Sequence, residues 1–282
     1  MRLLLLPAPL LLLACTTVPA EGLARVRTWG IQLHGDLGDT APYDMLVLDP
    51  SMRPVAGKTC LAYVNVGEAE EYRPYWKTFW RAPEGGPGVP DYLLAADPDG
   101  WKGNYVVAYW DPRWQSLLWG GAGALVDEAL AAGFDGVFLD WVLAYRAAAV
   151  ADRGGDPERA MERLVCDLAA YARRKRPGAF VVLNNGALLA ARSKEVRRAI
   201  DGVVQESLWF GGRAGASWGD ADAGGALQAP PPELLAALAA IDRPVFTLDY
   251  AVREEHARGA RAASLDRGFV PFVSRTPLDR LP

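Results

Sequence analysis

The sequence predicts a single α/β domain, a (β/α)8 TIM barrel. Short apolar segments, each bounded by turn or capping residues, alternate in the second half of the chain with longer helical patterns, as in a parallel sheet with crossover helices. There are enough of these segments for eight strands, and the 282 residues fit a barrel of about 250 residues. No linker rich in proline, glycine or serine divides the chain, so we expect one domain. An open parallel sheet is the structural alternative.

The apolar segments give the expected strands and the periodic segments the expected helices. The strands are Trp29–Leu33, Met45–Leu48, Leu61–Val66, Phe134–Leu139, Phe180–Leu183, Gly202–Gln205, Val245–Leu248 and Phe269–Val273. The helices are Trp114–Ala132, Pro157–Arg176, Leu188–Ile200, Pro232–Ile241 and Glu254–Arg267, the second of them behind an Asp156 N-cap.

Two features make this barrel irregular. The connections Asp36–Asp44 and Pro50–Thr59 are too short for a full helix, so we expect the first two β-α units to be irregular. A long connection rich in aromatic residues follows the third strand, and we expect it to form an insertion.

Composition excludes several classes of function. The net charge is −4, and the 30 basic residues are spread along the chain, which argues against a nucleic-acid partner. The two histidines, His34 and His256, stand alone, and no motif has the spacing of metal ligands. We therefore expect no metal, no organic cofactor and no nucleic acid, and we expect a monomer.

The N-terminus has the pattern of an export signal. Arg2 is its only charge, and the apolar run that follows is too short to span a bilayer. Ala14 before Cys15 resembles a bacterial lipobox. We therefore expect a signal peptide over 1–14, a lipidated Cys15 with a tether over 15–27, and the TIM-barrel domain over 28–282. This predicts a membrane-anchored lipoprotein of the cell envelope; the alternative is a plain secretory signal and a secreted or periplasmic protein.

Five expected strands carry an acidic residue at or just beyond their carboxyl ends: Asp49, Glu68, Asp140, Glu206 and Asp249. In a parallel barrel these ends share one face, where barrel active sites form. Any one of these acids could instead cap a helix or turn. Five together favour acid/base chemistry or a cationic ligand, because crowded carboxylates raise some pKa values and attract positive charge.

Barrel layering narrows the choice of a catalytic pair. Inward residues of alternate strands share a level, and Asp49, Asp140 and Glu206 belong to the second, fourth and sixth strands. Glu68 and Asp249 belong to odd-numbered strands. A retaining glycosidase needs two carboxyl groups about 5–5.5 Å apart, whereas a wider gap admits a water molecule for inversion.

Aromatic residues are concentrated near the expected mouth. Eleven of them lie between residues 71 and 114, including Tyr109 and Trp110, and Trp209 follows Glu206 in a segment that could form a lid. Aromatic faces suit the C–H face of a sugar and attract cations. We expect more than half of the eleven only to pack the insertion against the barrel, with Tyr109, Trp110 and Trp209 as candidates for substrate binding.

Several segments together resemble a known family. They are Trp29–Leu33, Tyr43–Asp49, Ala62–Glu70 with Tyr72-Arg73 after it, and Phe134–Asp140, in this order. With them the chain resembles glycoside hydrolase family 114, the endo-α-1,4-polygalactosaminidases, from about residue 28 to the end.

The resemblance implies an endo-acting enzyme that cleaves α-1,4-linked galactosamine in partly deacetylated exopolysaccharides of microbial biofilms. By motif the family's two carboxylates match Asp140, expected as nucleophile, and Glu206, expected as general acid/base, with net retention. Further expected cleft residues are Asp49, Glu68 and Asp249, which would hold the sugar's ammonium group, and Tyr63, Asn185 and Tyr250. The alternatives are a noncatalytic surface barrel that binds polysaccharide and a glycosidase for another α-linked glycan.

Overall fold

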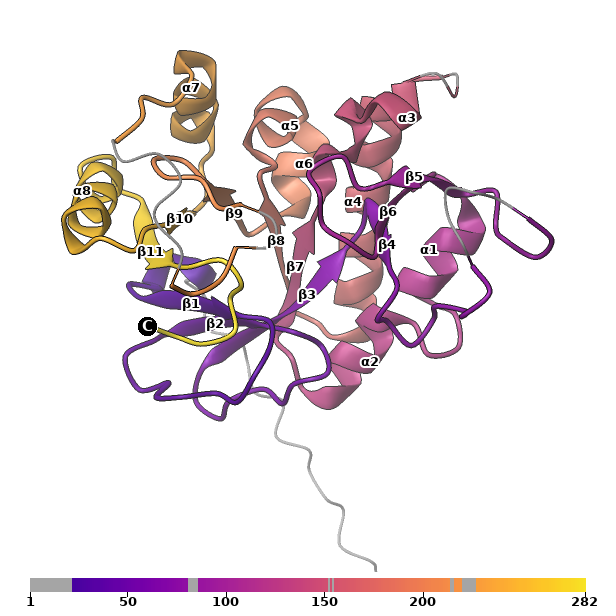
Figure 1. Ribbon diagram of the computed structural model, residues 1–282, viewed down its shortest axis with the longest axis horizontal. Coiled ribbons are helices and arrows are strands. Elements are labelled where there is room, and N and C mark those ends of the chain that lie inside the picture. The colour runs from indigo at the N-terminus through magenta and orange to yellow at the C-terminus, as the bar shows by residue number, and fades with distance from the viewer. Residues whose placement is uncertain (1–21, 81–85, 152, 154, 214–215, 220–226) are drawn as a thin grey trace, which may run out of the picture.

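A computed structural model describes residues 22–80, 86–151, 153, 155–213, 216–219 and 227–282. Its centre is a parallel eight-stranded sheet that curls into a nearly closed barrel (Figure 1). The fold is the predicted (β/α)8 barrel. In sheet order the strands are β1 (Trp29–Gln32), β2 (Met45–Leu48), β3 (Thr59–Asn65), β7 (Gly136–Asp140), β8 (Phe180–Asn184), β9 (Gly202–Glu206), β10 (Val245–Tyr250) and β11 (Val270–Ser274).

β1 and β11 are the two ends of the sheet, and they are joined by individual hydrogen bonds and side-chain packing. The Trp29 indole donates to the Val270 carbonyl at 3.0 Å, and the Leu33 amide donates to the Leu278 carbonyl at 2.8 Å. Trp29 also packs against Phe246 and Phe272, with ring centroids 5.7 and 5.5 Å apart. The seam is therefore closed mainly by side chains and by the chain beyond β11.

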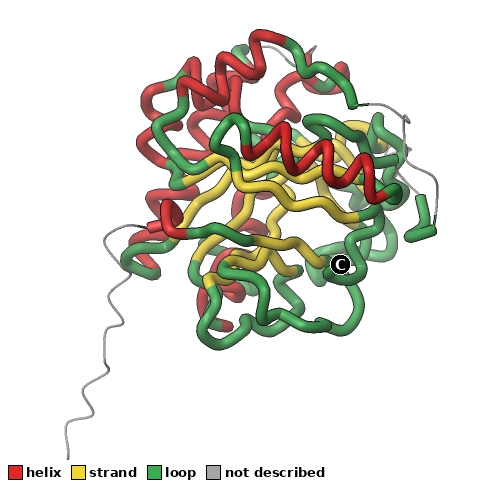
Figure 2. Tube along the Cα trace, turned by 90° about the vertical axis from the view of Figure 1, so that its left-hand side faces the viewer, coloured by secondary structure: helices red, strands yellow, loops and turns green. Residues whose placement is uncertain are grey.

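Helices cover the outside of the barrel (Figure 2). They are α1 (Pro112–Leu118), α2 (Leu125–Ala132), α3 (Ala148–Ala151), α4 (Pro157–Lys175), α5 (Ala187–Arg192), α6 (Lys194–Ala199), α7 (Pro232–Ala240) and α8 (Glu254–Leu265), with short 3-10 turns η1 (Gly22–Arg25) and η2 (Val142–Arg146). In α4 the Asp156 side chain caps the Arg159 amide at 3.0 Å, as the sequence predicts. Residues 33–44 and 49–58, both fully described, contain no helix and form the loops at the bottom of Figure 1.

Two expected helices are each two shorter helices. The helix expected over Trp114–Ala132 breaks between α1 and α2, where Gly120 and Gly123 have φ of 77° and 68°, values that glycine adopts without strain. The helix expected over Leu188–Ile200 breaks at Ser193, whose hydroxyl accepts the Val196 amide and caps α6.

The insertion after β3 contains a small antiparallel sheet that the sequence did not predict. Its strands are β4 (Glu68–Glu70), β6 (Asn104–Val107) and β5 (Leu93–Ala96), in that order. Trp76 stacks on Tyr105 at 5.0 Å, and further rings join this pair into one cluster. The cluster packs the insertion beside the barrel near α1 (Figure 1). Most of the eleven aromatic residues serve this packing, as expected.

The N-terminal part of the domain starts earlier than the expected boundary at residue 28. Leu23 and Val26 are buried in the same apolar cluster as the barrel strands. Residues 22–27 therefore pack on the barrel and are not a free tether. The expected signal peptide, Cys15 and the tether up to residue 21 lie outside the described residues. Within the described part of the chain, no helix is long and apolar enough to cross a membrane.

Candidate active site

Three neighbouring strands end in polar residues that contact one another. Asp140 ends β7, Asn184 ends β8 and Glu206 ends β9. The Asn184 amide nitrogen donates to Asp140 Oδ1 at 2.9 Å and to Glu206 Oε2 at 2.8 Å. Since both oxygens bond the same nitrogen, their separation cannot exceed the sum of these two distances. The two half-buried carboxyl groups are thus held as a pair with one amide between them.

Two tyrosines from flanking strands hold the other oxygens of this pair. Tyr63 of β3 donates to Asp140 Oδ2 at 2.7 Å, and Tyr250 of β10 donates to Glu206 Oε1 at 2.6 Å. The Trp141 amide adds a donor to Asp140 Oδ1 at 2.8 Å. Every oxygen of the pair therefore accepts a bond from a neutral donor, which fixes both carboxyl groups without an ion pair.

The electrostatics of the pair favour a proton on Glu206. Burial and the nearby negative charge of Asp140 raise the pKa of Glu206 above its usual range. Burial also raises the pKa of Tyr63 and of Tyr250 well above the usual value, so both hydroxyls stay protonated and act as donors. A carboxylic acid beside a hydrogen-bonded carboxylate is the arrangement that proton transfer to a leaving group requires.

The residue after each of the three polar strand ends has a left-handed backbone. Trp141, Asn185 and Ser207 have φ of 57°, 56° and 54°, which is uncommon for residues other than glycine. Each turns the chain directly after Asp140, Asn184 or Glu206, the residues whose side chains form the carboxyl pair and its bridge. Gly67 makes room for one of these turns, because a Cβ there would clash with the Trp141 carbonyl oxygen.

Asn185, expected in the cleft, supports the backbone of the site. Its side-chain oxygen accepts the Glu206 amide at 3.0 Å and the Gln205 side chain at 2.7 Å. The neighbouring Asn184 bridges the carboxyl groups, and sequence reasoning missed it. The available signal was its position, because Asn184 ends its strand just as Asp140 and Glu206 end theirs.

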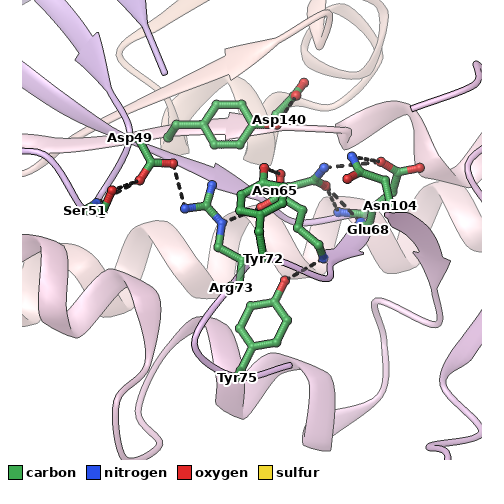
Figure 3. A network of polar contacts seen from close by, with 12 residues as sticks. Asp49, Ser51, Asn65, Glu68, Tyr72, Arg73, Tyr75, Asn104 and Asp140 are labelled. Carbon is green, nitrogen blue, oxygen red and sulfur yellow. Dashed lines mark hydrogen bonds and ion pairs between the residues drawn. The ribbon is translucent and has the colours of Figure 1, made fainter. Parts of the chain in front are cut away.

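Asp49 lies in a separate buried network (Figure 3). Its Oδ2 accepts Arg73 Nη1 at 2.7 Å, and its Oδ1 accepts the Ser51 amide and hydroxyl. Arg73 Nε also bonds Glu70 at 2.6 Å. The side chains of Arg73 and Asp49 are only 4% and 8% exposed, so the charge of Asp49 is already paired within the protein. Sequence reasoning named Arg73 only as part of the family resemblance and gave it no role, because the pairing with Asp49 joins segments that only the fold brings together.

Two of the five acids are enclosed and do not open to the mouth. Glu68 begins β4 and is fully buried; its Oε2 accepts the side-chain amides of Asn65 and Asn104. Burial and a contact with Asp97 raise the pKa of Glu68 to about 10, so it is neutral at pH 7. Asp249 is also fully buried, and its Oδ1 accepts the Trp209 and Phe210 amides. Because both side chains are enclosed, they do not lie where they could hold the ammonium group of a sugar, and the expectation for Glu68 and Asp249 is corrected.

The three aromatic candidates also differ in their positions. Tyr109 is fully buried, and its hydroxyl donates to the Pro157 carbonyl at 2.7 Å. Trp209 is 4% exposed and donates to the Ser264 hydroxyl at 2.8 Å. Both pack the interior, which corrects the expectation that they bind substrate. Trp110 is partly exposed and lies edge-on to Tyr109.

Known proteins match this chain in sequence and in fold. The model of glycoside hydrolase family GH114 matches residues 14–281. The chain belongs to this family. Membership makes it a glycoside hydrolase. The pair of carboxyl groups lies at the carboxyl ends of the barrel strands, the face on which barrel active sites form. Within the described residues, no three histidine, cysteine or acidic side chains are grouped to hold a metal ion.

One relative and two solved structures illustrate the match. An uncharacterised protein of Deinococcus radiodurans is 32% identical over 280 residues, which cover 92% of this chain and 83% of that protein. Ega3 of Aspergillus fumigatus, solved in complex with galactosamine, has a TM-score of 0.66 at 18% identity and covers 90% of this chain and 93% of its own. The glycoside hydrolase domain of PelA from Pseudomonas aeruginosa has a TM-score of 0.62 at 21% identity, with coverage of 91% and 100%. At these identities both structures show the shared fold.

Proposed function

We propose that this glycoside hydrolase is an endo-acting enzyme that cleaves α-1,4-linked galactosamine in partly deacetylated exopolysaccharide, with retention at the anomeric carbon. The observation that carries the proposal is the pair Asp140 and Glu206 with the Asn184 amide between them. Retaining enzymes hold their carboxyl groups about 5–5.5 Å apart and inverting enzymes about 6.5–9.5 Å apart. The bonds from the Asn184 nitrogen to one oxygen of each group keep the two groups close, which supports the shorter separation.

The proposed reaction uses each carboxyl group in the state that its surroundings favour. Asp140 attacks the anomeric carbon and forms a glycosyl ester, while Glu206 gives its proton to the departing glycosidic oxygen. Glu206, now ionised, takes a proton from water, which attacks the same carbon and releases Asp140. Burial and the charge of Asp140, which raise the pKa of Glu206, support its role as the acid in the first step.

The galactosamine substrate is supported by the family and by one structural neighbour. Ega3, which has the same fold, was solved with galactosamine bound. A polymer that carries ammonium groups suits a site whose open carboxyl groups are Asp140 and Glu206. Asp49, already paired with Arg73, adds little net attraction for a cation.

Product analysis tests the proposal. The protein is incubated with partly deacetylated α-1,4-galactosamine oligomers, and the products are measured by mass spectrometry alongside Asp140→Asn and Glu206→Gln, both checked for folding by circular dichroism. We expect the wild type to cleave the oligomers and both variants to leave them intact. NMR of the wild-type reaction should detect the α anomer as the first product. Initial release of the β anomer would contradict retention.

Two other outcomes would replace the proposal. Binding of the oligomer without cleavage, unchanged in Glu206→Gln, would identify a noncatalytic polysaccharide-binding barrel. Cleavage of another α-linked glycan, with galactosamine oligomers left intact, would keep the glycosidase and change its substrate.

We also propose that the protein is exported and anchored through a lipidated Cys15. The support is the sequence pattern before Cys15. Mass analysis of the protein from its membrane fraction would show cleavage before Cys15 and the added lipid. A mature form that is unmodified at Cys15 and released from the membrane would contradict the anchor.

A further inference from the structure

The insertion carries one exposed aromatic residue whose surroundings differ from those of the others. Among the residues that the structure describes, four aromatic side chains are prominently exposed: Tyr72 (56%), Phe79 (57%), Trp101 (43%) and Trp110 (36%). Among them, Tyr72 is the one held at its polar end by a buried network, since its hydroxyl donates to Glu70 Oε1 at 2.6 Å. Burial of that hydroxyl and the nearby charge of Glu70 raise its pKa. The hydroxyl end of Tyr72 is therefore fixed while much of the side chain faces solvent.

One face of the Tyr72 ring rests on a cation. The Arg73 guanidinium carbon lies 4.8 Å from the ring centroid, and Arg73 is itself fixed by Asp49 and Glu70. The opposite face has no ring or cation contact in the described part of the chain. Tyr72 is thus a rigid ring with one supported face and one open face.

The same guanidinium connects Tyr72 to the carboxyl pair. Arg73 also lies over the Tyr63 ring, 5.7 Å from its centroid, and Tyr63 donates to Asp140. Figure 3 shows Tyr72, Arg73 and Asp49 together, with Asp140 in the same view. A single arginine therefore separates Tyr72 from the tyrosine that holds the proposed nucleophile.

From this geometry we infer that the open face of Tyr72 is a stacking subsite for a pyranose ring of the polymer, next to the unit that is cleaved at Asp140. The inference rests on the proposed function and adds a binding residue to it. The C–H face of a pyranose packs on an aromatic ring, and a ring already immobilised loses little entropy on binding. The subsite selects sugar chains long enough to reach it, so it acts on affinity for long oligomers and not on bond cleavage.

Kinetics on oligomers of increasing length test the subsite. Tyr72→Ala is compared with Phe79→Ala, a matched control of equal exposure whose ring lies beside Gly88 and not on Arg73. With partly deacetylated α-1,4-galactosamine oligomers, Tyr72→Ala should raise KM about five- to tenfold for the longest chains, with kcat within about twofold and no change for the shortest cleaved chain. Phe79→Ala should match the wild type at every length. Equal kinetics for the two variants would overturn the subsite.

A second variant separates the ring from its anchor. Tyr72→Phe keeps the stacking face and loses only the bond to Glu70, so it should stay within about twofold of the wild type in KM. A loss as large as that of Tyr72→Ala would overturn the stacking role. Melting curves of all three variants identify any that has lost its fold.

Binding measurements distinguish failure of the subsite from failure of the proposed function. If the wild type cleaves no galactosamine oligomer, its affinity for the longest one is measured by calorimetry and compared with that of Tyr72→Ala. Weaker binding by the variant keeps the subsite although the glycosidase activity has failed. Equal binding, or no binding by the wild type, overturns the subsite.

Discussion

Two regions of the mouth contain acids that look alike in the sequence and differ in their chemistry. At the ends of β7 and β9, Asp140 and Glu206 are half-buried, and their side chains are held by neutral amide and hydroxyl donors. On the side of β2 and the insertion, Asp49 is paired with Arg73, and Glu68 is enclosed in a neutral state. An acid at a strand end is therefore available to a substrate only where the surrounding residues leave its side chain accessible and do not pair it with a cation.

The sharpest test of this comparison replaces one glutamate on each side. Glu206→Gln should lower kcat by about a thousandfold or more, because the amide cannot give a proton to the leaving oxygen. Glu68→Gln should stay within about twofold of the wild type, because a neutral amide replaces an acid that is already neutral at pH 7. Steady-state kinetics on one oligomer measures both. Equal losses would show that the two sides do not differ as described.

The second prediction concerns stability on the insertion side. Arg73→Gln leaves Asp49 and Glu70 buried without their cation, so the free energy of unfolding should fall by about 3–5 kcal/mol. Urea denaturation at pH 7 measures it. Arg113→Gln is the matched control, since the Arg113 side chain, which pairs with Asp91 and Asp111, is itself 60% exposed, and its urea midpoint should equal that of the wild type. A wild-type midpoint for Arg73→Gln would contradict the buried network.

The amide that bridges the carboxyl pair gives a third, smaller effect. Asn184→Ala removes a donor from Asp140 and from Glu206, so kcat should fall about 10- to 100-fold. That donor favours the ionised form of Glu206, and its loss raises the pKa of Glu206 further. The alkaline limb of the pH profile, where Glu206 loses its proton, should therefore move to higher pH. Asn104→Ala, which changes the environment of Glu68 instead, should leave this limb in place.

The smallest effect is expected at Asp249, where burial raises the pKa to about 6. A raised pKa in the folded state means that the folded protein holds this proton more tightly, so this contribution to stability is full below about pH 4 and is lost as pH rises through 6. Asp249→Asn can still accept the Trp209 and Phe210 amides and removes this loss. Its unfolding free energy at pH 7 should equal or exceed that of the wild type, and its loss of stability between pH 4 and 7 should shrink. If the unfolding free energy of Asp249→Asn changed with pH as steeply as that of the wild type, the raised pKa of Asp249 would be contradicted.

The barrel could be predicted because each strand is a local pattern. The eight apolar segments lie within a few residues of the observed strands, and the N-cap at Asp156 fixes the start of α4. The sheet of the insertion could not be predicted, since β4 is only Glu68–Glu70 and consists of two glutamates and an alanine, residue types that are depleted in strands. Its strand character comes from pairing with β6, 34 or more residues away along the chain.

The sequence predicted which residues belong to the candidate site better than it predicted which of them contact one another. Asp140, Glu206, Tyr63 and Tyr250, named from the sequence, lie together in the structure, and their catalytic and binding roles stay predictions. Burial separates Glu68 and Asp249 from this group, and it depends on how the insertion and the chain after β9 pack. That packing cannot be inferred from the position of these residues along the sequence.

The left-handed residues Trp141, Asn185 and Ser207 have a consequence for engineering. Because the chain reverses at once after Asp140, Asn184 and Glu206, the orientation of these side chains is set within one residue of the strand. The connections farther along are then separable from the chemistry. Grafting the segment after Ser207 from a relative should alter which polymer is bound while leaving the carboxyl pair in place, which makes this barrel a scaffold for exchanging loops.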